Sequence, residues 1–292
     1  MCPNSPTLGK KISVVRLLRS RLTYVAYRGK RRLEDSARRR RRLGVKNGWC
    51  RYHHKSESLC KAHILPRAFY RRISGIDGEG FWLVTKGRQH AKRIPNGLYD
   101  QTMICAEADR EFGKYDNYAI QLFSEFSPST VYHDRDGRQF CQLDEYNFDL
   151  LSMFILSYLW RCHHSNLDPY RGFGIGRKFE EKIRTLLNTK KFDESYWFDH
   201  IVTIFYSSPD ELLFPLKFPF NAKKFGLNII ICYFFNYKVL IKLDSRPTPD
   251  WFRWASARRG SPLKILASSY DGSVEHQSDL KAFRDALRQG LT

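Results

Sequence analysis

The chain has 292 residues, of which 42% are hydrophobic and 27% are charged, and its formal net charge is +20. This composition excludes a wholly disordered chain, because it supplies enough apolar material to bury a core. Apolar runs such as residues 228–235 are far shorter than the roughly 20 residues of a membrane span, so we expect none. The basic excess favours a polyanionic partner such as nucleic acid.

The seven cysteines are odd in number and scattered along the chain, which is not the pattern of a disulfide framework. They are Cys2, Cys50, Cys60, Cys105, Cys141, Cys162 and Cys232. The start of the chain has no apolar segment typical of a secretory signal peptide. We therefore expect a reducing compartment, the cytoplasm.

Residues 1–44 are predicted to form a basic N-terminal arm. Fifteen Lys and Arg residues but only two acidic residues fall within the first 48 positions, and apolar residues at 12–22 have partly helical spacing. A run of five arginines follows, namely Arg38, Arg39, Arg40, Arg41 and Arg42. These arginines could contact nucleic-acid phosphates, or the arm could be a solvated tail. An organellar transit peptide and a misassigned start codon are further alternatives.

The remainder of the chain predicts an α+β fold in two parts. In the first part, residues 45–126, strand-like segments at 81–84 and 102–105 precede a helix over 106–126. The second part, residues 127–292, is expected to form a helical and β-sheet body. Its helices are predicted at 144–162, 176–187 and 279–288, and its strands at 200–206, at 263–267 and in two runs within 227–243 that fold back at Asn236.

Two segments carry residues typical of a catalytic or metal site. In the first, SLCKAHILPRAFYRR (58–72), His63 stands where a strand would end and turn. In the second, GLYDQTMICAEADREFGKYDNYA (97–119), a strand-like piece leads into a helix rich in acidic residues. Asp109 and Asp116 are seven positions apart and therefore share one face of that helix, while Asp100 precedes it.

These residue types suit the hydrolysis of a phosphodiester. That reaction requires a general base to activate water and a cation to stabilise the charge that builds on phosphate. Neutral imidazole suits the role of the base because its ordinary pKa is about 6.5. A hard cation such as Mg²⁺ or Mn²⁺ prefers oxygen ligands, and one or two carboxylates suffice when water and phosphate complete the coordination.

The two segments resemble the HNH, or ββα-metal, nuclease pattern, in which a histidine before Ile-Ile-Pro is followed by a hairpin strand and a helix. The chain looks like a divergent branch of HNH-like proteins of bacteria and phages. Those proteins pair a KAHIIP-like motif with a later LCxxCE…GxYE block and a helix that ends in Ser-x-x-Trp-Arg. Here that last motif is Ser157–Arg161, and the resemblance spans about residues 48–190.

The resemblance implies a role for each matching residue. His63 corresponds to the catalytic histidine, the general base. Asp100 lies near the position of the central Asn and would orient the imidazole or join the metal ligands. Asp109 takes the place of the last metal ligand, and Asp116 is a second candidate. The implied activity is a Mg²⁺- or Mn²⁺-dependent endonuclease of phage or defence biology, with DNA favoured over RNA as substrate.

A zinc site is also implied, although incompletely. Cys50 and His53 stand where such proteins have a first cysteine pair, and Cys105 matches the first cysteine of the second pair. The partner of Cys105 is Ala108, which excludes a four-cysteine site. Cys50, His53 and Cys105, with His54 as a further donor, could bind structural zinc, which is normally four-coordinate. The alternative is that they are relics of a lost site.

Other substitutions keep a second function open. Three arginines that follow His63 are candidate phosphate contacts, namely Arg67, Arg71 and Arg72. Ala62 occupies the position where many HNH sites have an acidic metal ligand. Together with Ala108, this substitution motivates a second hypothesis, an inactive HNH scaffold that binds nucleic acid. A third hypothesis is a structural component of a larger assembly, which grips nucleic acid through the basic arm.

Overall fold

The computed structural model describes residues 47–74, 81–83, 92–94, 97–128, 130–192, 197–206 and 217–288. The predicted basic arm, with Arg38 to Arg42, lies outside the described residues, and so do the side chains of Arg71 and Arg72. Among the described helices, none is long and apolar enough to cross a membrane.

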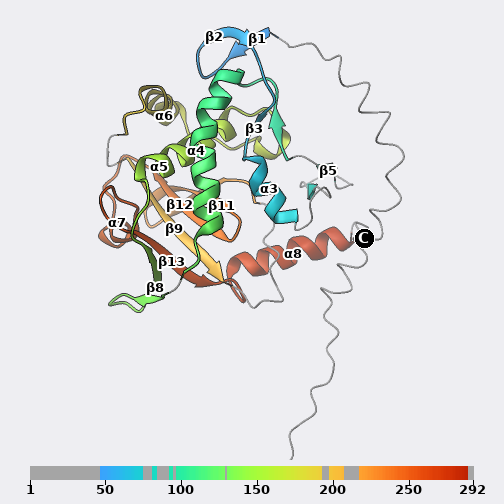
Figure 1. Ribbon diagram of the computed structural model, residues 1–292. Coiled ribbons are helices and arrows are strands. Elements are labelled where there is room, and N and C mark those ends of the chain that lie inside the picture. Colours follow the sequence, from blue (N-terminus) through green and yellow to red (C-terminus); the bar gives the residue numbers. More distant parts are fainter. Residues whose placement is uncertain are drawn as a thin grey trace, which may run out of the picture.

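A seven-stranded sheet forms the body of the molecule (Figure 1). Its strand order is β10-β11-β12-β9-β13-β8-β7, and neighbours are antiparallel except for the parallel pair β9 and β13. In chain order the strands are β7 (Tyr132–His133), β8 (Gln139–Leu143), β9 (Phe198–Tyr206), β10 (Phe220–Lys224), β11 (Leu227–Phe234), β12 (Tyr237–Leu243) and β13 (Leu263–Ser269).

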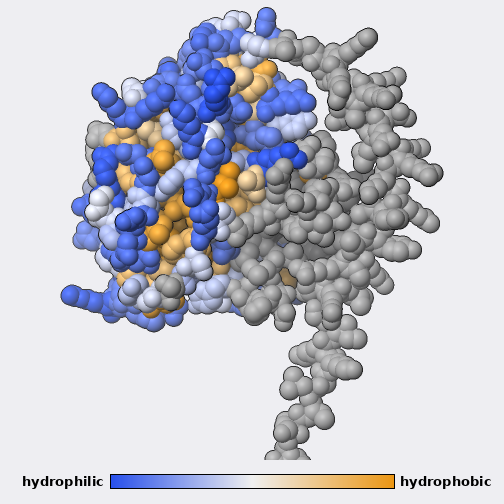
Figure 2. Space-filling view, viewed as in Figure 1, coloured by the Kyte–Doolittle hydropathy of each residue, from blue (hydrophilic) through white to orange (hydrophobic). Residues whose placement is uncertain are grey.

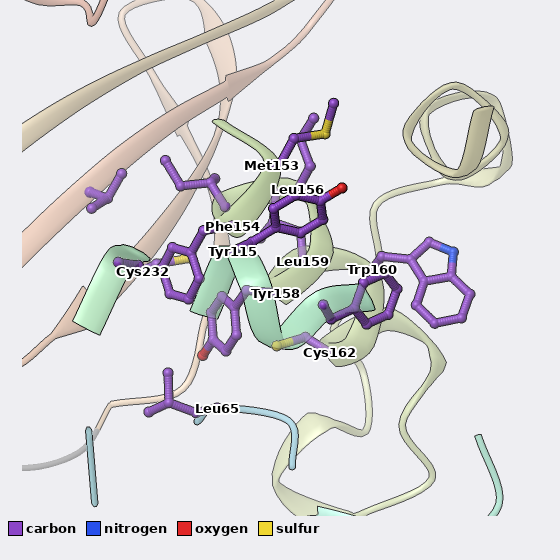
Figure 3. Packing of buried hydrophobic residues seen from close by; sticks show 14 of the residues in the cluster. Leu65, Tyr115, Met153, Phe154, Leu156, Tyr158, Leu159, Trp160, Cys162 and Cys232 are labelled. Atoms are coloured by element: carbon purple, nitrogen blue, oxygen red, sulfur yellow. The ribbon is translucent and has the colours of Figure 1, made fainter. Parts of the chain in front are cut away.

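Three helices pack around the main hydrophobic core on one face of this sheet. They are α4 (Ala106–Glu125), α5 (Phe148–His164) and α6 (Arg177–Thr189). Helix α5 lies in the middle of the core, because its sequence is apolar on all sides and 13 of its 17 residues are buried. Figure 3 shows its side chains packed with Leu65, Tyr115 and Cys232 from other parts of the chain.

The opposite face of the sheet carries a smaller core. Helix α7 (Asp250–Ala255) places Phe252 and Ala255 against Ile201, Ile229 and Ile231 of the sheet. Helix α8 (Val274–Arg288) is tied to the sheet through polar contacts, because Glu275 accepts hydrogen bonds from Tyr233 and Lys238. The described surface visible in Figure 2 is mostly hydrophilic, with apolar residues exposed near its centre.

The N-terminal part consists of short elements around the start of α4. The strands are β1 (Asn47–Cys50), β2 (Lys55–Ser58), β3 (Ala62–His63), β4 (Phe81–Leu83), β5 (Lys92–Ile94) and β6 (Tyr99–Asp100), and the helix is α3 (Arg67–Ser74). Three antiparallel pairs form, β1 with β2, β3 with β6, and β4 with β5. In chain order β3 is followed by α3, β4, β5 and β6, so the antiparallel β3–β6 pair precedes α4.

An aromatic cluster joins this N-terminal part to the body. Phe69 of α3 lies 6.4 Å from Phe123 of α4, 5.9 Å from Phe154 of α5 and 5.7 Å from Phe234 of β11, measured between ring centroids. All four rings belong to the same buried cluster. The two parts predicted from the sequence therefore share one hydrophobic core.

The predicted α+β class is confirmed, and so are most long elements. Helices α4, α5 and α6, strands β9 and β13, and the β11–β12 pair that turns at Asn236 all lie close to their predicted bounds. The predicted strand over 102–105 is wrong: the strand is β6, which ends at Asp100. The chain turns at Thr102 because its backbone N–H and its hydroxyl both donate to the Asp100 carboxylate.

Candidate metal centre and active site

Four side chains that can bind a metal ion converge where the β1–β2 hairpin meets the start of α4. They are Cys50 at the end of β1, His53 in the hairpin turn, Glu57 on β2 and Cys105 immediately before α4. Their ligand atoms all lie within 4.8 Å of one another. The two cysteines are buried and the other two residues are half-buried, so the group is largely shielded from solvent.

The distances within this group fit tetrahedral coordination. The two sulfurs are 3.6 Å apart, Sγ of Cys105 is 3.3 Å from Nδ1 of His53, and that nitrogen is 3.6 Å from Oε2 of Glu57. Zinc bound tetrahedrally at about 2.0–2.3 Å from each ligand sets ligand atoms about 3.3–3.8 Å apart. The donor set, two sulfurs, one nitrogen and one oxygen, is one that zinc accepts.

The surroundings of the group also suit a bound cation. The backbone N–H groups of His53 and Cys105 both point to Sγ of Cys50, at 3.5 and 3.4 Å, and would stabilise a thiolate there. Nε2 of His53 lies 3.7 Å from the Glu111 carboxylate, which would orient the ring. Oε2 of Glu57 is buried with no hydrogen-bond partner of ordinary geometry in the described chain.

Glu57 is the ligand that the sequence did not indicate. It lies on β2, opposite Gly48 of β1. Ala108, one turn into α4, is fully buried and offers no ligand, whereas Glu57 supplies the fourth. His54, the further donor considered from the sequence, is not in the group, and its ring lies 6.4 Å from that of Trp49.

Burial, together with the nearby Glu57 carboxylate, raises the pKa of the Cys105 thiol to about 12. A metal ion in the centre would have to displace this proton, as for any thiolate ligand. Metal binding at this group would therefore release a proton and weaken as pH falls.

His63 lies at the end of β3, the strand that follows the β1–β2 hairpin in the sequence. Its direct partner across the β3–β6 pair is Tyr99, and the two rings meet edge to face at 6.1 Å between centroids. Nζ of Lys61 lies 5.6 Å from the Tyr99 ring centroid. The imidazole is half-buried, so one side of it stays accessible.

The carboxylates of α4 and a buried arginine from α5 complete this cluster. Arg161 donates to both oxygens of Asp116, at 2.9 and 2.6 Å, and to the backbone carbonyl of His63 at 3.1 Å. Burial raises the pKa of Asp109, and the charge of Arg161, next in size, opposes this shift; His63 also lies close enough to affect it. The predicted residues His63, Asp109 and Asp116 therefore lie within electrostatic range of one another, and Arg161 joins them.

The ion pair between Asp116 and Arg161 is buried. The side chain of Arg161 is 1% exposed and that of Asp116 is 13% exposed. Burial raises the pKa of Asp116, and the guanidinium opposes this shift. Burial by itself would lower the pKa of Arg161, but the Asp116 carboxylate raises it above its ordinary value. Both Asp116 oxygens are occupied by Arg161, which leaves Asp109 as the carboxylate more open to a cation.

Asp100 has a different environment from the one expected of a ligand. Its Oδ1 accepts from the backbone and hydroxyl of Thr102, and its Oδ2 accepts from Ser165 Oγ and the Asn166 backbone N–H. Burial would raise the pKa of Asp100, but these four donors lower it. Asp100 thus fixes the turn after β6 to the segment that follows α5, and it positions the strand that carries Tyr99.

Of the three arginines after His63 that were predicted to contact phosphate, only Arg67 has a described side chain. Arg67 begins α3 and is exposed, three residues beyond the buried Ile64.

Comparison of the chain with protein-family models, curated proteins and solved structures finds no match. The functional proposals therefore rest on the sequence pattern and on the geometry of the described residues.

Proposed function

We propose that the chain is a metal-dependent nuclease of the HNH type that hydrolyses phosphodiester bonds in nucleic acid. The observation that carries the proposal is the cluster of His63, Asp109, Asp116 and Arg161, formed by a β-β-α unit and the end of α5. A histidine at a strand end beside a helical carboxylate and a fixed guanidinium combines the base and the cationic environment that phosphodiester hydrolysis needs.

In this proposal His63 takes the proton from the attacking water. Arg161 holds the backbone carbonyl of His63, and the His63 ring meets the Tyr99 ring edge to face. Arg161 is held by Asp116 and is turned toward the carbonyl of His63. The ion pair therefore positions the base, and Asp116 acts through Arg161 on its orientation.

Asp109 would hold the divalent cation, Mg²⁺ or Mn²⁺. It is half-buried on the first turn of α4, within electrostatic range of His63 and Arg161. A single protein carboxylate fits a hard cation whose other ligands are water and substrate phosphate. Bound there, the cation would stabilise the negative charge that develops on the phosphate.

A separate structural role is proposed for the cluster of Cys50, His53, Glu57 and Cys105, which we expect to bind zinc. All four positions are filled by side chains, and structural zinc sites have four protein ligands, whereas catalytic sites keep one position open. The site would fasten the β1–β2 hairpin to α4, close to β3. This role does not depend on whether His63 is catalytic.

An inactive scaffold that binds nucleic acid is the second candidate function. Two observations favour it: both oxygens of Asp100 are engaged by protein donors, and the Ala62 side chain is fully buried where an acidic ligand would stand. In this function Asp109 and His63 would remain as residues of a lost site. The proposed zinc site and the body of the fold would still be required for nucleic-acid binding.

Cleavage of plasmid DNA and of total RNA with added Mg²⁺ or Mn²⁺ separates the two functions. We expect wild type to cut, and His63→Ala and Asp109→Asn to lose at least about a hundredfold of the rate. His133→Ala, a change at an exposed histidine on β7, is the matched control and should cut normally. If wild type binds nucleic acid but cuts no substrate, the scaffold function holds and the nuclease proposal fails.

A further inference from the structure

A second charged surface lies on the body of the fold. Between α7 and β13 the structure has an open pocket of about 380 Å³. Arg253, Arg258 and Lys264 line it, opposed by the single carboxylate of Asp250. The α7 and β8 elements lie at the end of the molecule remote from the β1–β2 hairpin (Figure 1), so this surface is separate from the His63 cluster.

Within the described part of the chain, the hydrogen bonds of the three cations engage only some of their donors. Within the described chain Arg253 donates to the carbonyl of Thr248 at 3.4 Å, and Lys264 donates to that of Trp254 at 3.2 Å. Arg258 pairs with Asp199. Because Lys carries three donor hydrogens and Arg five, each side chain has further donors to offer an anion. The charge of the pocket therefore suits a phosphate group.

A row of aromatic rings leads away from the pocket along β8 and β7. Trp254 lies 5.4 Å from Phe140, and Phe140 stacks on Tyr132 at 5.5 Å, measured between ring centroids. Arg138 and Lys264 lie at 5.4 and 4.7 Å from the Trp254 ring centroid. The Tyr132 residue is 47% exposed, so it offers a ring to solvent at the edge of the sheet.

We infer that this surface binds single-stranded nucleic acid, with a phosphate in the pocket and a base on Tyr132. Cations beside a row of aromatic rings supply two kinds of contact for a single strand, one to its phosphate backbone and one to its bases. A duplex would present phosphates to the pocket but no free base to the ring. The surface would hold a strand away from the His63 cluster. The inference does not depend on whether that cluster cleaves nucleic acid.

Binding of the full chain to a fluorescent 20-nucleotide single strand and to a duplex of equal length tests the inference, by anisotropy without added Mg²⁺ or Mn²⁺. The Arg253→Gln/Lys264→Gln double variant should bind the single strand about tenfold more weakly at physiological salt. Its salt slope should fall by about 0.7, as expected when one phosphate contact of a single strand is lost. Tyr132→Ala should also lose about tenfold for the single strand, with little change for the duplex.

The matched control is Lys223→Gln/Lys224→Gln, which removes two exposed charges from β10, at the opposite edge of the sheet. It removes the same net charge and should cost less than threefold in affinity. Equal affinities for the two double variants would overturn the phosphate pocket. Unchanged single-strand affinity of Tyr132→Ala would overturn the stacking contact and with it the preference for single strands. Circular dichroism and thermal unfolding confirm that each variant is folded.

Discussion

At the scale of single residues, Arg161 connects the elements that form the candidate active site. Its guanidinium joins α5 to Asp116 on α4 and to the backbone of His63 on β3. The sequence offered Arg161 only as the end of a helix motif, because nothing in a one-dimensional pattern tells which acid a distant arginine meets. Glu57 was missed for a similar reason: several acids surround His53, and only the hairpin geometry selects Glu57.

Replacing Arg161 tests the buried pair. Arg161→Met should lower the free energy of unfolding by about 3–5 kcal/mol, because it leaves the Asp116 carboxylate buried without a partner. The measurement is urea unfolding followed by circular dichroism. Arg177→Met is the control: that side chain is 91% exposed in its pair with Glu181, so its loss should cost less than about 1 kcal/mol. Similar losses in both variants would contradict a structural role for the pair.

His200 makes the stability of the body depend on pH. Burial, and next the charge of Arg258, lower the pKa of His200 to about 3, and the ring packs between Phe148 and Phe198. The folded chain therefore resists protonation at His200, whereas the unfolded chain accepts a proton near the ordinary pKa of about 6.5. Stability is lost as pH falls below that value, by about 1.4 kcal/mol per pH unit until about pH 3.

The His200→Leu variant should lack this contribution. Between pH 6 and 4 the free energy of unfolding of wild type should fall more steeply than that of the variant, by about 1.4 kcal/mol per pH unit. Urea unfolding at each pH gives both curves, and other titrating groups cancel in the difference. His133→Leu, at an exposed histidine, should follow wild type. Parallel curves for wild type and His200→Leu would show that His200 is protonated in the folded chain.

At the scale of elements, the sequence predicted long elements well and short ones poorly. Helix α5 was recognisable because a helix buried on all sides needs a continuous apolar sequence, and α4 because its apolar positions recur at helical spacing. Strand β10, FNAKK, was missed because an edge strand exposed to solvent has no alternation to detect. Strands β3 and β6, two residues each, carry no pattern of their own, so the position of His63 at a strand end was inferred from the Ile-Leu-Pro that follows it and not from periodicity.

The β3–β6 pair depends on Gly97, which has φ of +81° two residues before Tyr99. A Cβ at this position would lie 2.5 Å from the ring of the buried Tyr70. Gly137 has a similar φ of +77°, but nothing lies within 4 Å of its added Cβ. The two glycines therefore separate the cost of backbone strain from the cost of a steric clash.

Gly137→Ala should lower the free energy of unfolding by about 1–2 kcal/mol, the cost of a left-handed alanine. Gly97→Ala should lose this amount and about 1–3 kcal/mol more, because the buried Tyr70 ring has to move. Chemical unfolding of both variants gives the comparison. If the nuclease proposal is right, Gly97→Ala should also lower the cleavage rate. Equal stabilities of the two variants would mean that the Tyr70 ring can move without lowering the free energy of unfolding.

At the scale of the whole molecule, two sets of contacts hold the N-terminal part on the body. One is the shared aromatic core around Phe69. The other is the β1–β2 hairpin: the Arg51 guanidinium donates to the carbonyl of His164 at the end of α5, and the backbone N–H groups of Arg51 and Cys60 donate to the carbonyls of Met103 and Ile104 just before α4. The candidate metal centre lies between these backbone contacts and α4. Its loss should therefore loosen the hairpin and β3 while leaving the sheet folded.

Removal of the metal tests this arrangement. We expect the purified chain to contain stoichiometric zinc, and a strong chelator to lower Tm by about 5–10 °C, because the ion stabilises only the state in which its four ligands are assembled. Glu57→Gln should reduce the zinc content and bring Tm close to that of the chelated wild type. Glu107→Gln changes a neighbouring acid that is 57% exposed and outside the ligand group, so it should retain both zinc and Tm. Metal content measured by mass spectrometry, together with thermal unfolding, gives the result. Full zinc content in Glu57→Gln would mean that the ion is held by Cys50, His53 and Cys105 without the carboxylate, and the absence of zinc from wild type would overturn the centre.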